Sequence, residues 1–385
     1  MRARWFVCVV LVCVTASCTT GSATAPTAKP NETPATSATA SPAGVTLADG
    51  AGLPDGCSGA IHPTQTVAFA ADGRAWTVDP AGRDLACLFA YGDPGPFAWG
   101  PQGDRVVLGQ FHVQSLTKDG PDLPGIDFQP TVFDWGHPIG LAIVFASASG
   151  QPLKRFMDDG RVEPLPRLPK GTYQAIAYHP SGLALGFIVD EGARQGIWIS
   201  SNEGTDPTRL VFSKPDTVFS SIAFSPDGKR IWWIAQHAGA ISEIHAMDLA
   251  DRTGFSTVLT RGLAATAHGL LLAPSGPLMA ATQGADCAQG QAMVIDDRGA
   301  APALPKATGP TTALRWLDAS TLLVGVGGCG APTQLVTVDW THGGQATVVV
   351  SGVEVGAPRT VLHDAPTEVP APPKDATQAP AGGVG

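Results

Sequence analysis

One turn recurs along this chain, and it constrains the fold more than any other feature. The repeated unit is a short apolar run ending in an aromatic residue, a turn containing Pro and Gly, and a second apolar run. Residues 224–233 (Phe-Ser-Pro-Asp-Gly-Lys-Arg-Ile-Trp-Trp) are the clearest copy, and partial copies begin at Trp99, Tyr178 and Leu272. Because proline restricts φ and glycine permits the turn conformation, each copy predicts a β-hairpin.

A second turn gives an independent count of the repeats. In this turn a strand-like run enters a polar stretch that a glycine closes. The seven closing glycines are Gly82, Gly120, Gly160, Gly204, Gly254, Gly299 and Gly343. They lie 38 to 50 residues apart, with a mean near 44, which matches the ~40–45-residue period of a four-stranded propeller blade. The sequence therefore predicts an all-β fold, a β-propeller of seven four-stranded blades.

The two ends of the repeat region predict how the ring closes. The first unit has three strand-like runs, and no run before residue 64 resembles its innermost strand. The last unit has four such runs, and a further short one, residues 359–363, follows it. We expect this run to enter the first blade, since closure removes exposed strand edges. The alternative is six complete blades, with residues 57–96 as a cap.

Composition excludes two other classes of protein. The chain has 46 Gly and 34 Pro in 385 residues, which disfavours long helices because each costs roughly 1–3 kcal/mol inside one. Hydrophobic residues make up 44% and charged residues 15%, so a large core is expected rather than disorder. The net charge is −9 and no Lys/Arg run is present. Nucleic-acid binding needs a basic footprint, so that class is excluded.

The first 18 residues predict export. Arg2 and Arg4 precede a ten-residue apolar run, residues 5–14, and small residues then lead to Cys18. This pattern is typical of a secretory signal peptide. Thr15-Ala16-Ser17-Cys18 resembles a bacterial lipobox, although Thr15 stands where Leu, Val or Ile is usual. The resemblance implies removal of residues 1–17 and lipidation of Cys18, a palmitate-bearing anchor; the alternative is ordinary cleavage with a free thiol at Cys18.

The chain divides into four segments. After the signal peptide (1–17), residues 18–50 form the lipidated cysteine and a disordered tether, since 23 of the 26 residues 19–44 are Ala, Thr, Ser, Pro or Gly and cannot bury a core. Residues 57–364 form the propeller. The Pro-rich residues 365–385 are expected to be a disordered tail.

The repeated turn also carries a family resemblance. Residues 224–229 reproduce the aromatic-Ser-Pro-Asp-Gly-Lys turn of the WD40-like repeats in TolB-like propellers, and residues 99–103, 178–182 and 272–276 reproduce it in part. The resemblance covers roughly residues 64–350 and implies a propeller. Members of the family with an α/β domain ahead of the propeller differ from this chain, where the tether takes that place, so the resemblance does not imply their role in envelope assembly.

Four cysteines remain after export: Cys57, Cys87, Cys287 and Cys329. Four cysteines allow three pairings. Cys287 and Cys329 occupy the same loop of the sixth and seventh repeats, so we expect them to pair, which leaves Cys57 to pair with Cys87. Disulfides are favoured over a metal site because an exported chain meets an oxidising compartment and no Cys-x-x-Cys is present.

The search for catalytic motifs is negative. The sequence has no Gly-x-Ser-x-Gly elbow, no His-Glu-x-x-His, no P-loop and no Gly-x-Gly-x-x-Gly turn, and its nine histidines are scattered singly. Asp158-Asp159 and Asp296-Asp297 lie in the repeated polar turn, where Asp is favoured for backbone hydrogen bonding. No catalytic set, metal site or cofactor is predicted.

Three polar residues depart from the pattern of the innermost strands. The position before the aromatic residue is alanine at 98, 177 and 223, but Asp134 and Arg315 replace it in the third and seventh units. Charges near a propeller axis would line the channel, where a buried charge needs a partner or a ligand. His268, at the start of the sixth innermost strand, is a third candidate. The alternative is that each is solvated by channel water or bonded to nearby backbone.

These observations predict a lipid-anchored, extracytoplasmic propeller on a bacterial cell membrane. The leading hypothesis is a non-catalytic binding or scaffold module for a protein or glycan partner, because one set of loops carries a mixed polar surface. Its residues are Asp190, Glu191, Arg194, His237, Glu243 and Asp286. Two alternatives stay open: an extracytoplasmic hydrolase or lyase with a central-channel site, and an accessory lipoprotein of a membrane sensor or transporter.

Overall fold

The structure is a computed structural model, and the part of the chain that it describes begins at residue 45 and ends at residue 358. The gaps in this range are 56–63, 91–97, 100–104, 109–111, 116–131, 136–142, 147–152, 158–160, 193, 213–216, 238–241, 251–254, 260–262, 264–265, 285–288, 328–332 and 353–354. The predicted signal peptide, Cys18 and the Pro-rich tail lie outside the described residues. All described residues belong to one compact unit, Pro42–Gly385.

The described residues form strands and no α-helix, as the Gly and Pro content predicts. The strands make seven antiparallel sheets, which we number blades 1 to 7 in chain order. Blades 1 to 3 contain β28 (Val355–Pro358), β2 (Val67–Ala71), β3 (Arg74–Val78) and β4 (Ala86–Ala90); β5 (Ala98–Trp99), β6 (Arg105–Leu108) and β7 (His112–Ser115); and β8 (Val132–Trp135), β9 (Ile143–Ala146), β10 (Lys154–Phe156) and β11 (Val162–Pro164).

The strands of blades 4 to 7 are mostly longer. Their strands are β12 (Thr172–Tyr178), β13 (Ala184–Asp190), β14 (Gln195–Ser201) and β15 (Thr208–Phe212); β16 (Thr217–Phe224), β17 (Arg230–His237), β18 (Ser242–Asp248) and β19 (Phe255–Leu259); β20 (Ala267–Leu272), β21 (Met279–Gln283), β22 (Gln291–Asp296) and β23 (Gly299–Pro302); and β24 (Thr311–Trp316), β25 (Thr321–Val326), β26 (Gln334–Asp339) and β27 (Gln345–Ser351).

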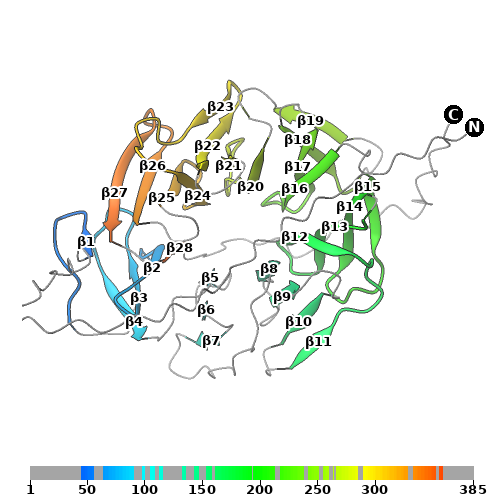
Figure 1. Ribbon diagram of the computed structural model, residues 1–385, viewed down its shortest axis with the longest axis horizontal. Helices are drawn as coiled ribbons and strands as arrows, with labels where there is room; N and C mark the ends of the chain where they lie inside the picture. Colours follow the sequence, from blue (N-terminus) through cyan, green and yellow to red (C-terminus); the bar gives the residue numbers. More distant parts are fainter. Residues whose placement is uncertain are drawn as a thin grey trace, which may run out of the picture. The chain divides into compact units, whose positions relative to one another are not determined.

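The arrangement of the sheets is that of a β-propeller. Within each blade consecutive strands pair antiparallel, and the first strands of neighbouring blades contact one another in the order β8, β12, β16, β20, β24, β28 and β5. Figure 1 shows the blades around a common centre, with these strands innermost. The predicted fold class is confirmed. The described residues form seven sheets, while the blade count of the complete chain stays a prediction.

The repeated turn has the hydrogen bonds that its sequence predicts. In the turn between β16 and β17, Asp227 Oδ1 accepts hydrogen bonds from the Ser225 hydroxyl at 2.6 Å and from the Lys229 amide at 3.0 Å. Gly228 has a positive φ of 68°, a conformation that costs glycine little. The turn residues therefore specify the hairpin through hydrogen bonds within the turn itself.

The C-terminal end of the described chain supplies the first strand of blade 1. β28 pairs with β2, with Val67 opposite Pro358 and Ala70 opposite Val355. The predicted closing strand, residues 359–363, was placed too late, and it lies outside the described residues. The reason is a short connection: β27 ends at Ser351, Gly352 turns the chain with a positive φ of 78°, and β28 begins at Val355.

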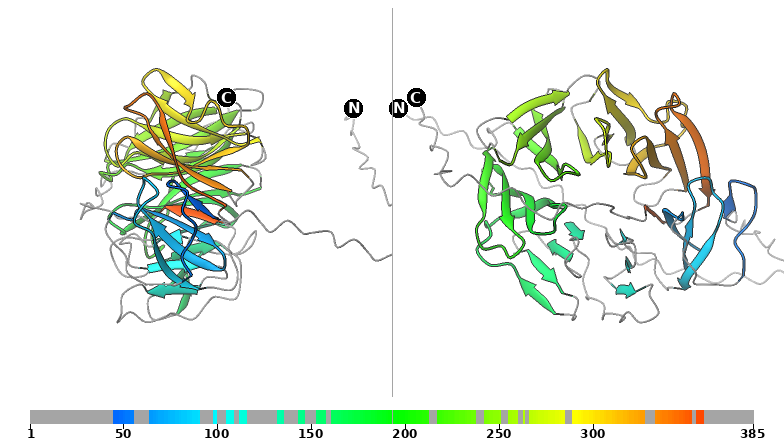
Figure 2. Two further views of the ribbon diagram at one scale, coloured as in Figure 1. Left: turned by 90° about the vertical axis from the view of Figure 1, so that its left-hand side faces the viewer. Right: turned by 180° about the vertical axis from the view of Figure 1, so that it is seen from behind.

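The segment before blade 1 also differs from the expectation. Residues 45–50 were predicted to belong to the disordered tether, yet β1 (Thr46–Leu47) adds to the outer edge of blade 7 by pairing with Val350 and Ser351 of β27. In Figure 2, β1 (blue) lies beside β27 (orange). Leu47 is buried against side chains of blades 1 and 7, and this burial explains why so short a strand is held.

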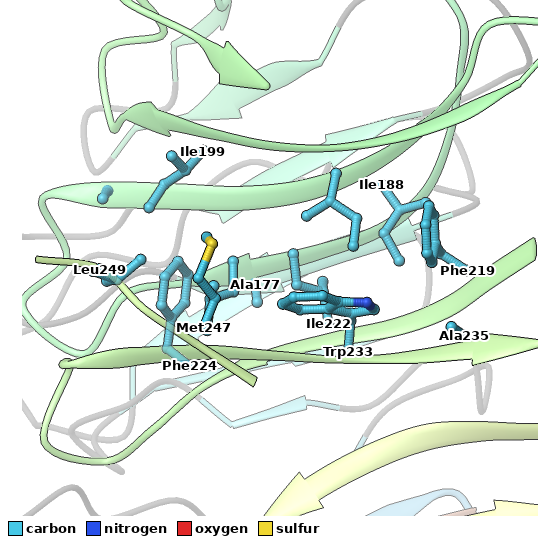
Figure 3. Close-up of a cluster of buried hydrophobic side chains, with 13 residues drawn as sticks. Ala177, Ile188, Ile199, Phe219, Ile222, Phe224, Trp233, Ala235, Met247 and Leu249 are labelled. Carbon is cyan, nitrogen blue, oxygen red and sulfur yellow. The ribbon is translucent and has the colours of Figure 1, made fainter. Parts of the chain in front are cut away.

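Among the described residues, apolar side chains pack between neighbouring blades from blade 3 round to blade 1. Figure 3 shows the cluster between blades 4 and 5, where Ile188 and Ile199 of blade 4 meet Ile222, Phe224 and the 1%-exposed Trp233 of blade 5. The facing sheets of blades 4 and 5 approach each other closely at Gly186. A Cβ at residue 186 would lie 3.0 Å from the Ile222 side chain, so only glycine fits without a shift.

The aromatic residues that end the innermost strands belong to these interblade cores. Tyr178, Phe224 and Trp316 are each 8% exposed or less and belong to clusters that link neighbouring blades. Trp99 and Trp135 end the corresponding strands of blades 2 and 3. In the described part of the chain, no helix is long and apolar enough to cross a membrane.

Candidate functional site

Asp134 lies on the innermost strand of blade 3, where the register predicts it. Its Oδ2 atom accepts a hydrogen bond from the backbone N–H of Tyr178 at 2.6 Å. Tyr178 ends β12, the innermost strand of blade 4. The carboxylate therefore joins two neighbouring blades, which matches the alternative that it is bonded to nearby backbone.

Arg315 occupies the same register on β24 of blade 7 and is half-buried. Burial lowers the pKa of its guanidinium to about 10, and the negative charge of Asp134 opposes part of that shift. Blades 3 and 7 are not neighbours in the ring, so the two charges act on each other across its centre. The two predicted residues thus lie close enough for their charges to interact, while a ligand at this place stays a proposal.

His268 lies near the start of β20, the innermost strand of blade 6, and is half-buried. Burial lowers the pKa of its imidazole. The pairing of β20 with β21 is irregular between His268 and Leu271, and Gly269 has a positive φ of 66°. The Gly269 amide donates a 2.7 Å hydrogen bond to Ser221 Oγ of blade 5.

Ala267, the residue before His268, is also hydrogen-bonded to blade 5. The Ala267 carbonyl accepts hydrogen bonds from the Ser220 hydroxyl at 2.5 Å and from the Gln236 amide nitrogen Nε2 at 2.6 Å. Both donors belong to blade 5. The backbone on both sides of His268 is thus hydrogen-bonded to blade 5. These bonds hold this part of blade 6 against blade 5, at the end of the sheets where β16 and β20 begin.

Four residues at the same end of blade 5 form a group that the sequence did not predict, although His237 and Glu243 were both expected on the mixed polar loop surface. We call Thr217, His237, Glu243 and His245 the histidine cluster. Glu243 Oε2 lies 3.0 Å from His245 Nε2 and 3.4 Å from His237 Nε2. His237 Nδ1 lies 2.9 Å from the Thr217 hydroxyl. One carboxylate thus contacts two imidazoles. The side chain of His237 is 40% exposed, and His245 is buried.

The strand register explains this group. Ala235 pairs with Glu243 and Trp233 pairs with His245 across β17 and β18, so alternate residues of both strands share one face. The His245 ring stacks on Trp233, with ring centroids 5.6 Å apart and planes 13° from parallel. The signal in the sequence was Glu243-x-His245, because residues two apart on a strand point the same way.

Blade 4 places a second charged group on the same rim. Glu191 lies 3.5 Å from Arg194 and also pairs with Arg209, whose guanidinium stacks over Trp198 at 4.6 Å. Glu191 follows β13 and Arg194 precedes β14 in blade 4, whereas His237 ends β17 and Glu243 lies near the start of β18, the equivalent strands of blade 5. We call Glu191, Arg194, His237 and Glu243 the charged rim.

Asp296, in the last turn of blade 6, has a structural role. Asp296 accepts hydrogen bonds from the Arg298 amide at 2.9 Å and from Trp340 Nε1 of blade 7 at 3.2 Å. Its carboxylate holds an outer turn and a neighbouring blade, which supports the interpretation made from the repeat. Asp158 and Asp159 lie outside the described residues.

Cys87 is buried on β4 and is disulfide-bonded. Cys57, Cys287 and Cys329 lie outside the described residues, so the two predicted pairings stay predictions. Among the residues that the structure does describe, no group of three or more His, Cys, Asp or Glu is arranged to hold a metal ion.

His179 is fully buried in the turn between β12 and β13, and it joins blades 4 and 5. Its Nδ1 lies 2.7 Å from the Ser181 hydroxyl, and its Nε2 lies 2.8 Å from the Gly228 carbonyl of the next blade. Since a carbonyl only accepts, Nε2 carries the proton. Burial lowers the pKa of His179.

We expect acid to destabilise the fold below about pH 6.5. Burial lowers the pKa of His179, His245 and His268 in the folded state, whereas the unfolded chain has ordinary values near ~6.5. Below ~6.5 the unfolded chain binds more protons, so stability is present above that pH and is lost as pH falls through the folded-state values. Thermal melts between pH 7.5 and 5 should show a falling Tm; a flat profile would contradict the shifts.

Comparisons with known proteins show similarity of structure only. No protein-family profile matches the sequence, and no curated protein matches it. The chain is similar to TolB from Acinetobacter baumannii, at 13% identity and a TM-score of 0.43, over 76% of this chain and 64% of that one. It thus spans less than two thirds of the TolB chain.

Two further solved structures are similar. One is a nidogen–laminin complex, at 10% identity and a TM-score of 0.44, over 77% of this chain and 98% of that one. The other is a catalytically inactive virginiamycin B lyase from Staphylococcus aureus with quinupristin, at 17% identity and a TM-score of 0.45, over 69% of this chain and 94% of that one. At these values the similarities carry no functional argument, and the propeller assignment rests on the sheet topology.

Proposed function

We propose that this chain is an extracytoplasmic, lipid-anchored β-propeller that binds a protein or glycan partner on the charged rim of blades 4 and 5, without catalysing a reaction. The observation that carries the proposal is the rim itself. Two adjoining blades present Arg194, His237 and Glu243 with 53%, 40% and 32% of their side chains exposed. The rim offers hydrogen-bond donors and acceptors to a partner that carries charged or hydroxyl groups.

The ion pairs on the rim favour binding over proton chemistry. Glu191 is engaged by Arg194 and Arg209, and Glu243 by two histidines. Such pairs hold side chains in defined positions, which lowers the entropy lost when a partner binds. Complementary charges then give the contact its specificity.

The membrane anchor is supported by the sequence. The apolar run of residues 5–14, the small residues before Cys18 and the Ala/Thr/Ser/Pro-rich stretch after it are the parts of an exported lipoprotein. A diacylated cysteine supplies the two chains that stable anchoring requires.

The binding proposal is tested by chemical cross-linking in intact cells that express the chain. Arg194→Ala combined with His237→Ala leaves the Glu191–Arg209 pair in place, and we expect it to reduce partner recovery at least about tenfold, as loss of central contacts does. Lys229→Ala with Arg230→Ala, two exposed cations of the opposite turn, is the matched control. Recovery equal to wild type in the rim variant would refute the proposal.

Anchoring is expected to depend on Cys18. Cys18→Ser should remove labelling by a radioactive fatty acid and leave either unprocessed precursor or soluble chain, because the thiol that carries the lipid is gone. Processing of the wild-type precursor that continues in the presence of globomycin would show that the signal is not that of a lipoprotein.

A further inference from the structure

The first described strand joins the propeller at the end that carries the charged rim. In blade 7, Gln334 begins β26, and its Nε2 atom donates a 2.9 Å hydrogen bond to the hydroxyl of Ser351, which ends β27. The third strands of blades 4 and 5 also begin at the charged rim, so Gln334 and Ser351 mark the same end of blade 7. We call it the rim end. Thr46 of β1 pairs with Ser351, so the chain enters the propeller there.

Apolar contacts from two blades hold this entry in place. Leu47 is 8% exposed, and Leu53 packs against the same cluster between blades 1 and 7. The turn at Gly82 in blade 1 lies close against Ala48, since a Cβ at residue 82 would be 2.5 Å from the Ala48 Cβ. We call residues 45–54 the entry segment.

The next described residues meet the propeller at its opposite end. Thr64 Oγ1 donates a hydrogen bond to Asp84 Oδ2 at 3.2 Å, and Gln65 Nε2 donates one to the Asp84 carbonyl at 2.5 Å. Asp84 lies in the turn between β3 and β4, at the end of the sheets opposite the rim end, which we call the turn end. A chain that first met the propeller at Thr64 would enter at the turn end. The entry segment therefore determines the end of the propeller from which the preceding residues start.

The length of the predicted tether gives this choice a consequence. Residues 19–44 are 26 residues between Cys18 and the entry segment, and a flexible chain of that length has a root-mean-square end-to-end distance of about 28 Å. β17 has 8 residues, which at ~3.3 Å each make its sheet about 26 Å tall. In the anchored chain the rim end is then within the average reach of the tether, and the turn end is one sheet height farther from the membrane.

The charges of the rim favour a protein over a lipid surface. Arg194 and Glu243 give the rim both signs of charge. Anionic lipid surfaces attract clusters of Lys and Arg, whereas this sequence has a net charge of −9 and no Lys/Arg run. A protein surface can present both signs at matching positions.

We propose that the entry segment turns the charged rim toward the membrane that carries the anchor, so that the rim binds the extracytoplasmic part of a protein embedded in that membrane. This orientation rests on the proposed function, because it requires the anchor at Cys18 and binding at the rim. The partner is then a membrane protein rather than a free glycan or a soluble protein.

Energy transfer to labelled lipids tests the orientation. Val218 and Lys229 are exposed residues at the rim end and the turn end of blade 5. Val218→Cys and Lys229→Cys, each carrying a donor fluorophore on the full-length lipidated protein, are reconstituted in phosphatidylcholine vesicles that contain an acceptor-labelled lipid. We expect at least about twofold more transfer from position 218, because the length of β16 puts the rim end about 20 Å nearer to the lipid. Equal transfer, or more transfer from position 229, would overturn the proposed orientation.

Release of the entry segment should remove this difference. Leu47→Asp with Leu53→Asp places two charges in the apolar cluster of blades 1 and 7, where burial penalises them, so β1 leaves β27 and the attachment moves to Thr64. Leu47→Met with Leu53→Met keeps apolar side chains there and is the matched control, which should behave as the wild type. A difference between positions 218 and 229 that survives release would show that the entry segment does not set the orientation. The wild-type comparison stays decisive even where the Asp variant folds poorly.

Cross-linking in intact cells tests the kind of partner. With the entry segment released, the rim no longer faces the membrane, so recovery of a membrane-embedded partner should fall at least about threefold as its effective concentration falls. A soluble partner reaches the rim in either orientation. Equal recovery from the Asp and Met variants would therefore overturn the assignment to a membrane protein.

Flotation of the vesicles separates failure of the orientation from failure of the proposed function. Protein that does not float with the vesicles would refute the lipid anchor, and with it both proposals. Protein that floats but shows equal transfer from the two labelled positions would refute the orientation alone and leave the anchor in place.

Discussion

Removal of residues 355–385 is expected to destabilise the propeller by ~5 kcal/mol or more, whereas removal of residues 359–385 leaves its stability within ~1 kcal/mol of the full chain. The first truncation deletes β28, which pairs with residues 67–70 of β2. Val67, Ala68 and Phe69 are fully buried. Four lost pairings at roughly 1 kcal/mol each, together with the apolar surface that they cover, give this magnitude.

Urea denaturation of the two truncated chains beside the full chain measures the difference. Since small domains are stable by only about 5–15 kcal/mol, the shorter chain should lose its cooperative transition or show it at much lower urea. The chain that lacks only residues 359–385 is the matched control, because it keeps β28 intact. Equal midpoints for the two truncations would show that β28 does not close blade 1.

The repeat predicted the blades because its signals are local. A Ser225–Lys229 turn forms hydrogen bonds within itself, and the aromatic residue before it marks the end of an innermost strand. Local signals of this kind do not depend on which strand lies next. The register that they set was enough to place Asp134 and Arg315 at equivalent positions in blades 3 and 7.

The segments that were placed wrongly depend on distant partners. β1 has two residues, Thr46 and Leu47, and such a short segment has no periodicity to detect. It is a strand because β27 offers an outer edge and because Leu47 finds an apolar pocket between blades 1 and 7. The closing strand was placed several residues too late for the same reason, since only pairing with β2 determines which apolar residues are used.

The histidine cluster at the candidate site likewise depends on strand pairing that the sequence does not specify. His237 and His245 are eight positions apart and were judged as separate single histidines. Their meeting at Glu243 depends on the pairing of β17 with β18, in which Gln236 lies opposite Ser242. A shift of one residue in this register would move Glu243 and His245 to the other face. The sequence alone does not determine that register.

Asp134 and Arg315 are expected to show measurable coupling in a double-mutant cycle. Asp134→Ala removes the acceptor of the Tyr178 N–H bond and should cost ~1–3 kcal/mol, the penalty for leaving a buried donor unsatisfied. It also removes the negative charge that favours the Arg315 cation. Arg315→Met keeps the volume of the side-chain stem and leaves the Tyr178 bond in place, so we expect it to cost less.

The double variant separates a structural pair from a ligand site. If the two charges compensate each other, the double variant should be less destabilised than the sum of the singles, by ~0.5–2 kcal/mol, a range typical of interacting residues. If instead Arg315 serves a ligand, the stability effects should be additive and Arg315→Met alone should weaken binding of the partner recovered by cross-linking. Additive stability effects with unchanged binding would remove both residues from the candidate site and leave the charged rim as its location.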